Sequence, residues 1–299
     1  MSFVNRSRNL TILLLILIPT CAAMSWLITT SILNTRTENI LNIDGSSTVF
    51  KIIDSAQYEF MESHPGVSVT TSGVGTGAGI TALIDGVAHI AMASRPVKDI
   101  ENESADYKLK SFAIAKDGLA IVIHASANTM NITIDEARAI FNGTVESWTD
   151  PLVAGTGLSG EIQLVVREEG SGTRDAFNEL VMGDDKQLEL GSEYGEGALP
   201  KSSNQLIKDA VAANPNYVGY IGLGYIDETV DAVLINGVLP SKESVQNSTY
   251  EIQRDLYLVT MGEPEGLSKE FINWIFSPVG QDIVIETGFI NVAQTSDED

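Results

Sequence analysis

The chain has 299 residues, of which 43% are hydrophobic, and its 40 acidic against 18 basic residues give a formal net charge of −22 at pH 7. That length accommodates two domains, and the hydrophobic fraction excludes wholesale disorder. The acidic balance argues against nucleic acid as a partner, because a phosphate backbone requires a basic surface. It also means that an anion site must rely on short-range donors, since the overall field repels anions.

The cysteine and histidine content argues against a metal centre. Cys21 is the only cysteine, so an intrachain disulfide or a cysteine-based metal cluster cannot form. The three histidines are scattered without the spacing of a metal site: His64, His89 and His124. We therefore expect no metal and no cofactor.

An apolar segment near the N-terminus predicts attachment to a membrane. Residues 10–33 carry no charged side chain, and about 20 apolar residues span a bilayer as a helix. Arg6 and Arg8 precede this segment, which favours a cytoplasmic N-terminus and an extracytoplasmic remainder. We expect an uncleaved signal anchor in this arrangement: a basic cytoplasmic N-terminus at 1–9, the anchor at 10–33 and a tether at 34–39.

A cleaved signal segment is the alternative. Cys21 would then carry lipid, as in bacterial lipoproteins, after a short apolar region. The residues before it match the lipoprotein motif poorly, so we favour the uncleaved anchor: Ile18, Pro19 and Thr20. Both interpretations hold the remainder of the chain at the outer face of the membrane.

Polar turns follow the predicted strands of the first part of the chain. Each strand leads into a turn rich in small donors or into an arginine: 40–43 into Asp44–Thr48, 67–70 into Gly73–Gly79, and 89–93 into Ser94 and Arg95. Helical patterns follow the first two turns, and strands separated by helices favour parallel pairing with helical crossovers. In open α/β sheets, ligands bind beyond the carboxyl ends of the strands.

The stretch Val165–Arg174 repeats this pattern with the strongest donor set. Strand 162–166 runs into Gly170-Ser171-Gly172-Thr173, and an amphipathic helix follows. The first turn of a helix offers unpaired N–H donors, and the hydroxyl and guanidinium groups here add further donors. This set suits a small tetrahedral oxyanion, although an ordinary capped helix after a turn is the alternative.

The remaining pattern predicts two crossings between two halves of the chain. Strands at 111–115 and 119–124 flank Lys116-Asp117-Gly118, where we expect the first crossing. The later elements are predicted as a helix at 134–141, a loop at 183–203, a helix at 204–212, a strand at 217–222, strands at 232–235 and 254–260 that lead back to the first half, helices at 267–276 and 279–286, and a disordered tail at 293–299.

Taken together, the motifs resemble those of a known family. From about residue 40 to 292 the chain is similar to the phosphate-binding proteins that serve ABC-type phosphate importers. The matching stretches occur in the same order and spacing, and the last is the most specific: Ile43–Thr48 (IDGSST), Gly73–Gly79 (GVGTGAG), Ala93–Arg95 (ASR), Phe141–Trp148 (FNGTVESW) and Arg167–Arg174 (REEGSGTR).

The resemblance implies an α/β fold of the type II periplasmic-binding-protein class. Two lobes, each a mainly parallel sheet flanked by helices and joined by two crossings, would close over one phosphate. The implied division places lobe 1 at 40–116 and 232–292, and lobe 2 at 117–231.

The resemblance also implies the binding residues, and no catalytic ones. Donors from both lobes would hold the phosphate: Ser47, Thr48, Thr76, Ser94, Arg95, Arg167, Ser171, Gly172 and Thr173. Glu169 would hold the Arg167 guanidinium in place.

Arg95 departs from the pattern of some family members, which have an aspartate at this position. That carboxylate accepts the proton of HPO₄²⁻ and so discriminates against sulfate, which carries no proton at neutral pH. Arginine cannot accept a hydrogen bond. The acceptor would then be Asp44, Glu168 or a backbone carbonyl, and a lobe-closing salt bridge is the alternative role for Arg95.

We therefore predict a monomeric extracytoplasmic receptor that captures inorganic phosphate and delivers it to an ABC permease. A receptor for sulfate, molybdate or tungstate is one alternative, and a sensor or adhesion domain that kept the fold is another. An enzyme acting on phosphoesters is disfavoured, because no histidine or lysine is placed by sequence beside Ser171 or Thr173 as a base.

Overall fold

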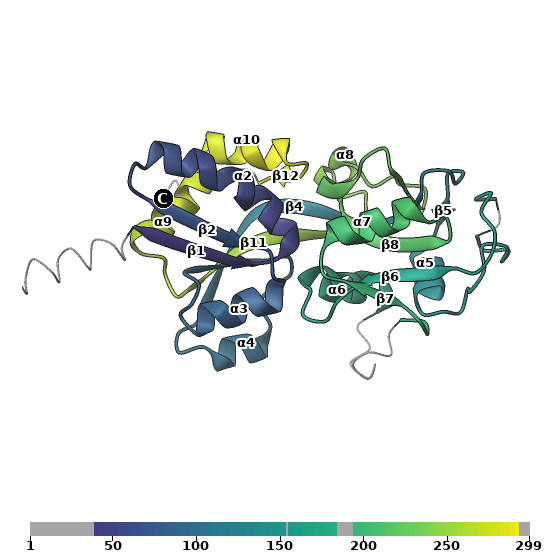
Figure 1. Cartoon of the computed structure of the whole chain (residues 1–299), viewed down its shortest axis with the longest axis horizontal. Coiled ribbons are helices and arrows are strands. Elements are labelled where there is room, and N and C mark those ends of the chain that lie inside the picture. Colours follow the sequence, from purple (N-terminus) through teal and green to yellow (C-terminus); the bar gives the residue numbers. More distant parts are fainter. Residues whose placement is uncertain (1–38, 154, 184–193, 293–299) are drawn as a thin grey trace, which may run out of the picture.

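The computed structural model describes residues 39–153, 155–183 and 194–292 (Figure 1). The predicted membrane anchor, nearly all of the predicted tether and the predicted C-terminal tail lie outside these ranges. Within the described ranges, the chain forms no helix that is both long and apolar enough to cross a membrane.

The chain alternates between helices and strands. The helices are α2 (Ser47–Ser63), α3 (Thr76–Ile84), α4 (Asp99–Ser104), α5 (Ile134–Phe141), α6 (Gly172–Phe177) with a π-helical turn at Asn178–Met182, α7 (Asn204–Ala213), a 3₁₀ turn at Leu223–Tyr225, α8 (Lys242–Gln246), α9 (Gly266–Ile275) and α10 (Pro278–Glu286). The strands are β1 (Ile40–Gly45), β2 (Ser68–Ser72), β3 (Ile90–Ala93), β4 (Leu109–His124), β5 (Asn131–Ile132), β6 (Gln163–Arg167), β7 (Leu199–Lys201), β8 (Tyr217–Gly222), β9 (Val230–Ala232), β10 (Leu234–Ile235), β11 (Gln253–Met261) and β12 (Ile290–Asn291).

One continuous ladder of strands runs through the molecule in the order β2-β1-β3-β11-β4-β8-β6-β7 (Figure 1). The outer pairs are parallel, as helical crossovers require: β1 with β2 and β3, and β6 with β7 and β8. The central strands β4 and β11 are antiparallel to each of their neighbours in this ladder. The predicted α/β class is confirmed, but the sheet is mixed rather than mainly parallel because the chain runs out along β4 and returns along β11.

Strand β4 is a single strand of 16 residues and not the two short strands expected from the sequence. Its first part pairs with β11 as far as Gly118, and its second part pairs with β8 from Leu119 onward. Both parts have a partner, so the turn-like Lys116-Asp117-Gly118 stays extended. The strand therefore carries the chain directly from one half of the molecule to the other.

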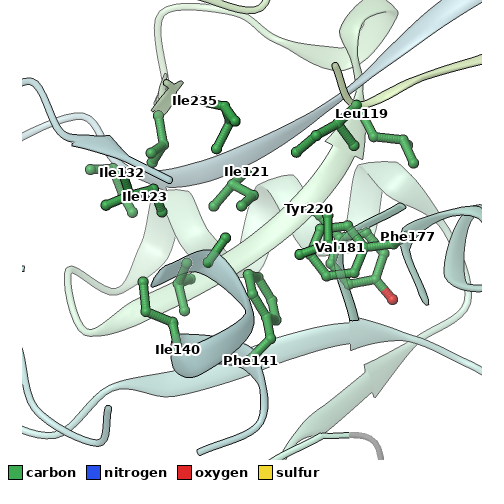
Figure 2. Packing of buried hydrophobic residues seen from close by; sticks show 14 of the residues in the cluster. Leu119, Ile121, Ile123, Ile132, Ile140, Phe141, Phe177, Val181, Tyr220 and Ile235 are labelled. Carbon is green, nitrogen blue, oxygen red and sulfur yellow. The ribbon is translucent and has the colours of Figure 1, made fainter. Parts of the chain in front are cut away.

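The ribbon divides into two lobes along the sheet (Figure 1). Four clusters of buried hydrophobic side chains fill them, two in each lobe. Lobe 1 surrounds β1–β3, and α2 contributes a buried face at helical spacing: Ile52, Ala56 and Phe60. The core of lobe 2 forms around the later part of β4, where Phe141, Phe177 and Tyr220 pack edge-to-face or stacked (Figure 2). Each lobe thus has its own core.

The return to lobe 1 occurs later in the chain than predicted. Residues 233–252 pack in the lobe 2 core, which contains the buried side chains of Val233, Ile235, Val245, Tyr250 and Ile252. The strand at 234–235 pairs with β5 of lobe 2 instead of leading back. The predicted boundary at residue 232 is therefore wrong, and β11 makes the second crossing from Gln253 onward.

Candidate anion-binding site

Two capped helix N-termini, one from each lobe, begin the site. The Ser46 side chain accepts hydrogen bonds from the amides of Thr48 and Val49 at the start of α2. In the same way, the Ser171 side chain accepts from the amides of Thr173 and Arg174 at the start of α6. The positive ends of both helix dipoles lie where the two sequence motifs predicted an anion site.

Glycine permits the tight turn into α2. Gly45 has a φ of +141°, and a Cβ atom there would lie 2.2 Å from the carbonyl oxygen of Met92. Only glycine allows β1 to approach β3 this closely and still deliver Ser46 to the cap. Backbone geometry thus explains the glycine of the IDGSST motif.

Hydroxyl and amide groups from the two lobes meet at Thr48. The Thr48 Oγ1 and Thr173 Oγ1 atoms are 3.0 Å apart, so α2 and α6 are in direct contact. Asn204 Nδ2, at the start of α7, donates to Thr48 Oγ1 at 2.8 Å. Arg254 Nη2, from β11, donates to the same oxygen at 3.2 Å. Motif analysis predicted Thr48 and Thr173 but missed Asn204 and Arg254.

The buried Arg167 guanidinium has one nitrogen, Nη1, without a hydrogen-bond partner among the described residues. Its side chain is 0% exposed, and its Nε and Nη2 atoms donate to the carboxylate of Glu168 at 3.0 and 2.8 Å. The same two nitrogens also donate to the carbonyl oxygens of Lys201 and Ser202. The prediction that Glu169 holds this guanidinium is wrong: Glu169 lies exposed in the turn before Gly170, and Glu168 takes that place.

Three buried polar atoms have no hydrogen-bond partner among the residues that the structure describes: Ser47 Oγ, Arg167 Nη1 and Asn204 Oδ1. Buried polar atoms are normally paired, because an unpaired one costs about 1–3 kcal/mol. Two of these atoms are hydrogen-bond donors, and all three belong to residues at or beside the contact between the lobes. Such a set is suited to a small anion that would satisfy the donors.

Thr76 and Ser94 face the backbone of Gly172 across the lobes. Thr76 Oγ1 accepts from the Ser94 amide at 3.2 Å. A Cβ atom on Gly172 would lie 2.3 Å from Thr76 Oγ1 and 2.7 Å from Ser94 Oγ. The start of α6 can therefore approach these hydroxyls only because residue 172 has no side chain.

We expect Gly172→Ala to weaken the binding of a small anion between the lobes at least tenfold, about 1.4 kcal/mol, because the added methyl group pushes the lobes apart. The helix itself would not suffer, since alanine is the better helix former. Titration calorimetry with phosphate would measure the change, with thermal unfolding as the check on folding. The milder control is Gly77→Ala, whose Cβ would lie 3.3 Å from the Gly170 carbonyl oxygen. Equal phosphate affinities for Gly172→Ala and the unmodified protein would contradict this prediction.

Arg95 forms an ion pair between the lobes, which was the alternative interpretation of this residue. Its Nε atom donates to Asp175 of α6 at 2.7 Å. Its Nη1 and Nη2 atoms donate to Glu101 of α4 at 2.9 and 2.6 Å. Burial by itself lowers the pKa of Arg95, but the two carboxylates outweigh that effect and raise it. The three guanidinium nitrogens therefore all bond to carboxylates.

A second buried ion pair joins the two crossing strands. Arg254 of β11 donates through Nη2 to Asp117 of β4 at 2.9 Å, and both side chains are nearly inaccessible. Arg254 Nη1 also donates to the carbonyl oxygens of Ser94 in lobe 1 and Gly172 in lobe 2. Burial raises the pKa of Asp117 and lowers that of Arg254, and each partner opposes the shift of the other. The pair therefore connects the crossing strands to both sides of the site.

Tyr220 supports Arg167 from the lobe 2 core. Its hydroxyl accepts from the Arg167 amide at 3.1 Å and bonds to the Tyr194 hydroxyl at 2.8 Å. Burial raises the pKa of Tyr220 to about 12, so this phenol stays protonated at neutral pH. The polar site is thus fixed to an aromatic core.

Comparison with known proteins identifies relatives of the chain. The family model of the PBP superfamily domain matches residues 33–279. The phosphate-binding protein PstS of Bacillus subtilis is 31% identical over 255 residues, which cover 84% of this chain and 80% of that protein. PstS of Borreliella burgdorferi is 28% identical over 264 residues, which cover 87% of this chain and 92% of that protein.

Solved structures agree with these matches. One is a protein of Clostridium perfringens that is described as a phosphate ABC transporter substrate-binding protein and was solved with bound phosphate. It superposes with a TM-score of 0.77 and is 33% identical, and the match covers 85% of this chain and 100% of that protein. An ABC-type phosphate transport receptor of Vibrio cholerae superposes with a TM-score of 0.69. It is 31% identical to this chain, and the match covers 84% of this chain and 100% of the receptor. The resemblance seen in the motifs is therefore confirmed, and the chain belongs to the PBP superfamily, in the family of the phosphate-binding proteins named PstS.

Proposed function

We propose that this protein is the substrate-binding receptor of an ABC-type phosphate importer and holds inorganic phosphate between its two lobes. The observation that carries the proposal is the pair of buried, unpartnered donors, Ser47 Oγ and Arg167 Nη1, beside the N-termini of α2 and α6. The names of the relatives support phosphate as the ligand.

The proposed ligands come from both lobes. Thr48 would orient Thr173, to which it is hydrogen-bonded, and Arg95 would close the lobes instead of touching the anion. The direct donors would be Ser47, Thr76, Ser94, Arg167, Ser171, Gly172 and Thr173. Charge-assisted hydrogen bonds in a site from which water is excluded gain strength, so a chain with a net charge of −22 can still bind a dianion.

The proposal extends to location and partners. The apolar segment at 10–33 supports attachment to the outer face of the membrane, where the protein, as a monomer, would deliver phosphate to the permease. A permease can select the loaded receptor if it recognises the form in which the lobes are in contact. In this scheme lobe 1 comprises residues 40–118 and 253–292, and lobe 2 comprises 119–252.

A receptor is favoured over an enzyme by the state of the two hydroxyls that could act as nucleophiles. Ser171 Oγ caps α6, and Thr173 Oγ1 bonds to Thr48. No histidine or lysine side chain is hydrogen-bonded to either hydroxyl in the described part of the chain. A nucleophilic hydroxyl requires such a base.

Isothermal titration calorimetry tests the proposal. The full-length chain in detergent is first freed of bound anion by partial unfolding and dialysis, and is then titrated with phosphate, sulfate and molybdate. We expect tight one-to-one binding of phosphate and little or no heat from the other two. Absence of phosphate binding, or tighter binding of sulfate or molybdate, would overturn the assignment.

A further inference from the structure

Asn204 is a buried amide that crosses from one lobe to the other. It is the first residue of α7 in lobe 2 and is 0% exposed. Its Nδ2 atom donates to Thr48 Oγ1 in lobe 1, while its Oδ1 atom has no partner among the described residues. The neighbouring Ser203 caps the helix, so Asn204 is not needed for that purpose.

The hydrogen bonds at Thr48 match the orientation that the structure gives the Asn204 amide. A hydroxyl oxygen has two lone pairs and one proton. Arg254 Nη2 can only donate and occupies one lone pair, and Asn204 Nδ2 occupies the other. The Thr48 proton is then given to Thr173 Oγ1, which leaves the Thr173 proton for an anion. In this network the oxygen of the Asn204 amide points away from Thr48 and remains an acceptor.

The other groups of the site are donors or already accept a hydrogen bond. Glu168 uses both carboxylate oxygens on Arg167. The carbonyl oxygens of Ser94 and Gly172 accept from Arg254, and no hydrogen bond joins the Asp44 side chain to the site within the described ranges. Among the described residues, Asn204 Oδ1 is thus a buried acceptor without a donor beside the anion-binding groups.

We propose that Asn204 Oδ1 accepts the proton of bound HPO₄²⁻ and thereby selects phosphate over sulfate. The inference rests on the proposed function. Phosphate retains at least one proton at neutral pH, whereas sulfate carries none and would place an unprotonated oxygen against the amide oxygen. That contact repels, and the acceptor left unmatched is costly to bury. A neutral amide also avoids adding a negative charge beside a dianion, as a carboxylate would.

The test compares three oxyanions on the full-length protein. Phosphate and arsenate both carry a proton at neutral pH, and sulfate does not. We expect Asn204→Ala to weaken the binding of phosphate and arsenate equally, while the binding of sulfate is unchanged or stronger. The phosphate-to-sulfate affinity ratio would fall at least tenfold, which corresponds to about 1.4 kcal/mol.

Two further variants separate this role from a structural one. Ser47→Ala removes a donor and should weaken the binding of all three anions by the same factor. Its phosphate-to-sulfate affinity ratio should therefore equal that of the unmodified protein. Asn204→Asp keeps an acceptor oxygen of the same shape, so its ratio should equal or exceed the original. Thermal unfolding checks that each variant is folded.

The inference is overturned if Asn204→Ala, or the equally shaped Asn204→Leu where the alanine variant does not fold, changes phosphate and sulfate affinity by one common factor. It is also overturned if the aspartate variant folds but prefers sulfate. If instead the unmodified protein binds neither phosphate nor arsenate, the proposed function itself fails, and that outcome is visible before any variant is made.

Discussion

Arg167→Ala is expected to lower phosphate affinity by about 2–5 kcal/mol, which is roughly thirtyfold to several-thousandfold in Kd. The variant removes Nη1, the buried donor without a partner in the described structure. It also leaves the Glu168 carboxylate, now without its guanidinium, beside the position proposed for a dianion. Both effects oppose binding, and titration calorimetry with phosphate measures their sum.

Three companion variants make this result interpretable. Arg138→Ala removes a half-exposed arginine of the same lobe, paired with Asp135, and should leave the affinity unchanged. Arg167→Lys retains the charge but loses the planar donor geometry, so affinity should return only in part. Arg167→Ala combined with Glu168→Gln should bind more tightly than Arg167→Ala, because the uncompensated carboxylate is gone. An Arg167→Ala protein that folds and binds phosphate normally would refute the proposed site.

Asp117→Ala is expected to lower the free energy of unfolding by about 3–5 kcal/mol, the usual effect of removing one partner of a buried ion pair. The Arg254 side chain is 4% exposed and would remain charged without its carboxylate. The Leu223 amide, which donates to Asp117 Oδ1 at 2.9 Å, would also lose its acceptor. Urea unfolding followed by circular dichroism measures the loss.

An adjacent exposed pair provides the control. Lys116→Ala breaks a salt bridge to Asp255 on the same two strands, where Lys116 is 47% exposed, and should cost less than about 1 kcal/mol. The double variant Asp117→Ala with Arg254→Met should be more stable than Asp117→Ala, since no buried charge is then left alone. If Asp117→Ala unfolds at the same urea concentration as Lys116→Ala, the pair does not stabilise the crossing.

The two predictions concern different parts of one connected network. Arg167 belongs to the anion-binding side of lobe 2, whereas Asp117 and Arg254 lie on the crossing strands. Arg254 nevertheless bonds to Thr48 and to the Gly172 carbonyl, so the crossing and the site are linked through direct contacts. We therefore expect Asp117→Ala to weaken phosphate binding as well as folding.

Local elements could be predicted from the chain because their signals lie within a few residues. The helix at 134–141 and the strand at 217–222 form with the predicted bounds. Periodicity and breaker residues encode these elements directly. The strand–turn–helix motif at 165–174 belongs to the same class of signal, since its cap and its glycines are contiguous.

The partners of the charged groups could not be predicted in this way. Arg254 and Asp117 are 137 residues apart in the chain, and Asn204 and Thr48 are 156 apart. Arg95 looked like an anion donor in its motif, yet α6 supplies Asp175 to it across the lobes. Glu168 and Glu169 are neighbours in the motif, and the motif does not show which of them pairs with Arg167. Only the direction of each side chain in the structure shows that Glu168 forms the ion pair.

Periodicity, caps and motifs thus determined most element types, the α/β class and the strand–turn–helix motif at 165–174, because each is encoded by neighbouring residues. The continuous β4, the late return at Gln253 and the orientation of Asn204 depended on how the two lobes meet. A buried polar atom takes whichever partner the packed backbone brings within about 3 Å, and that partner comes from a distant part of the chain.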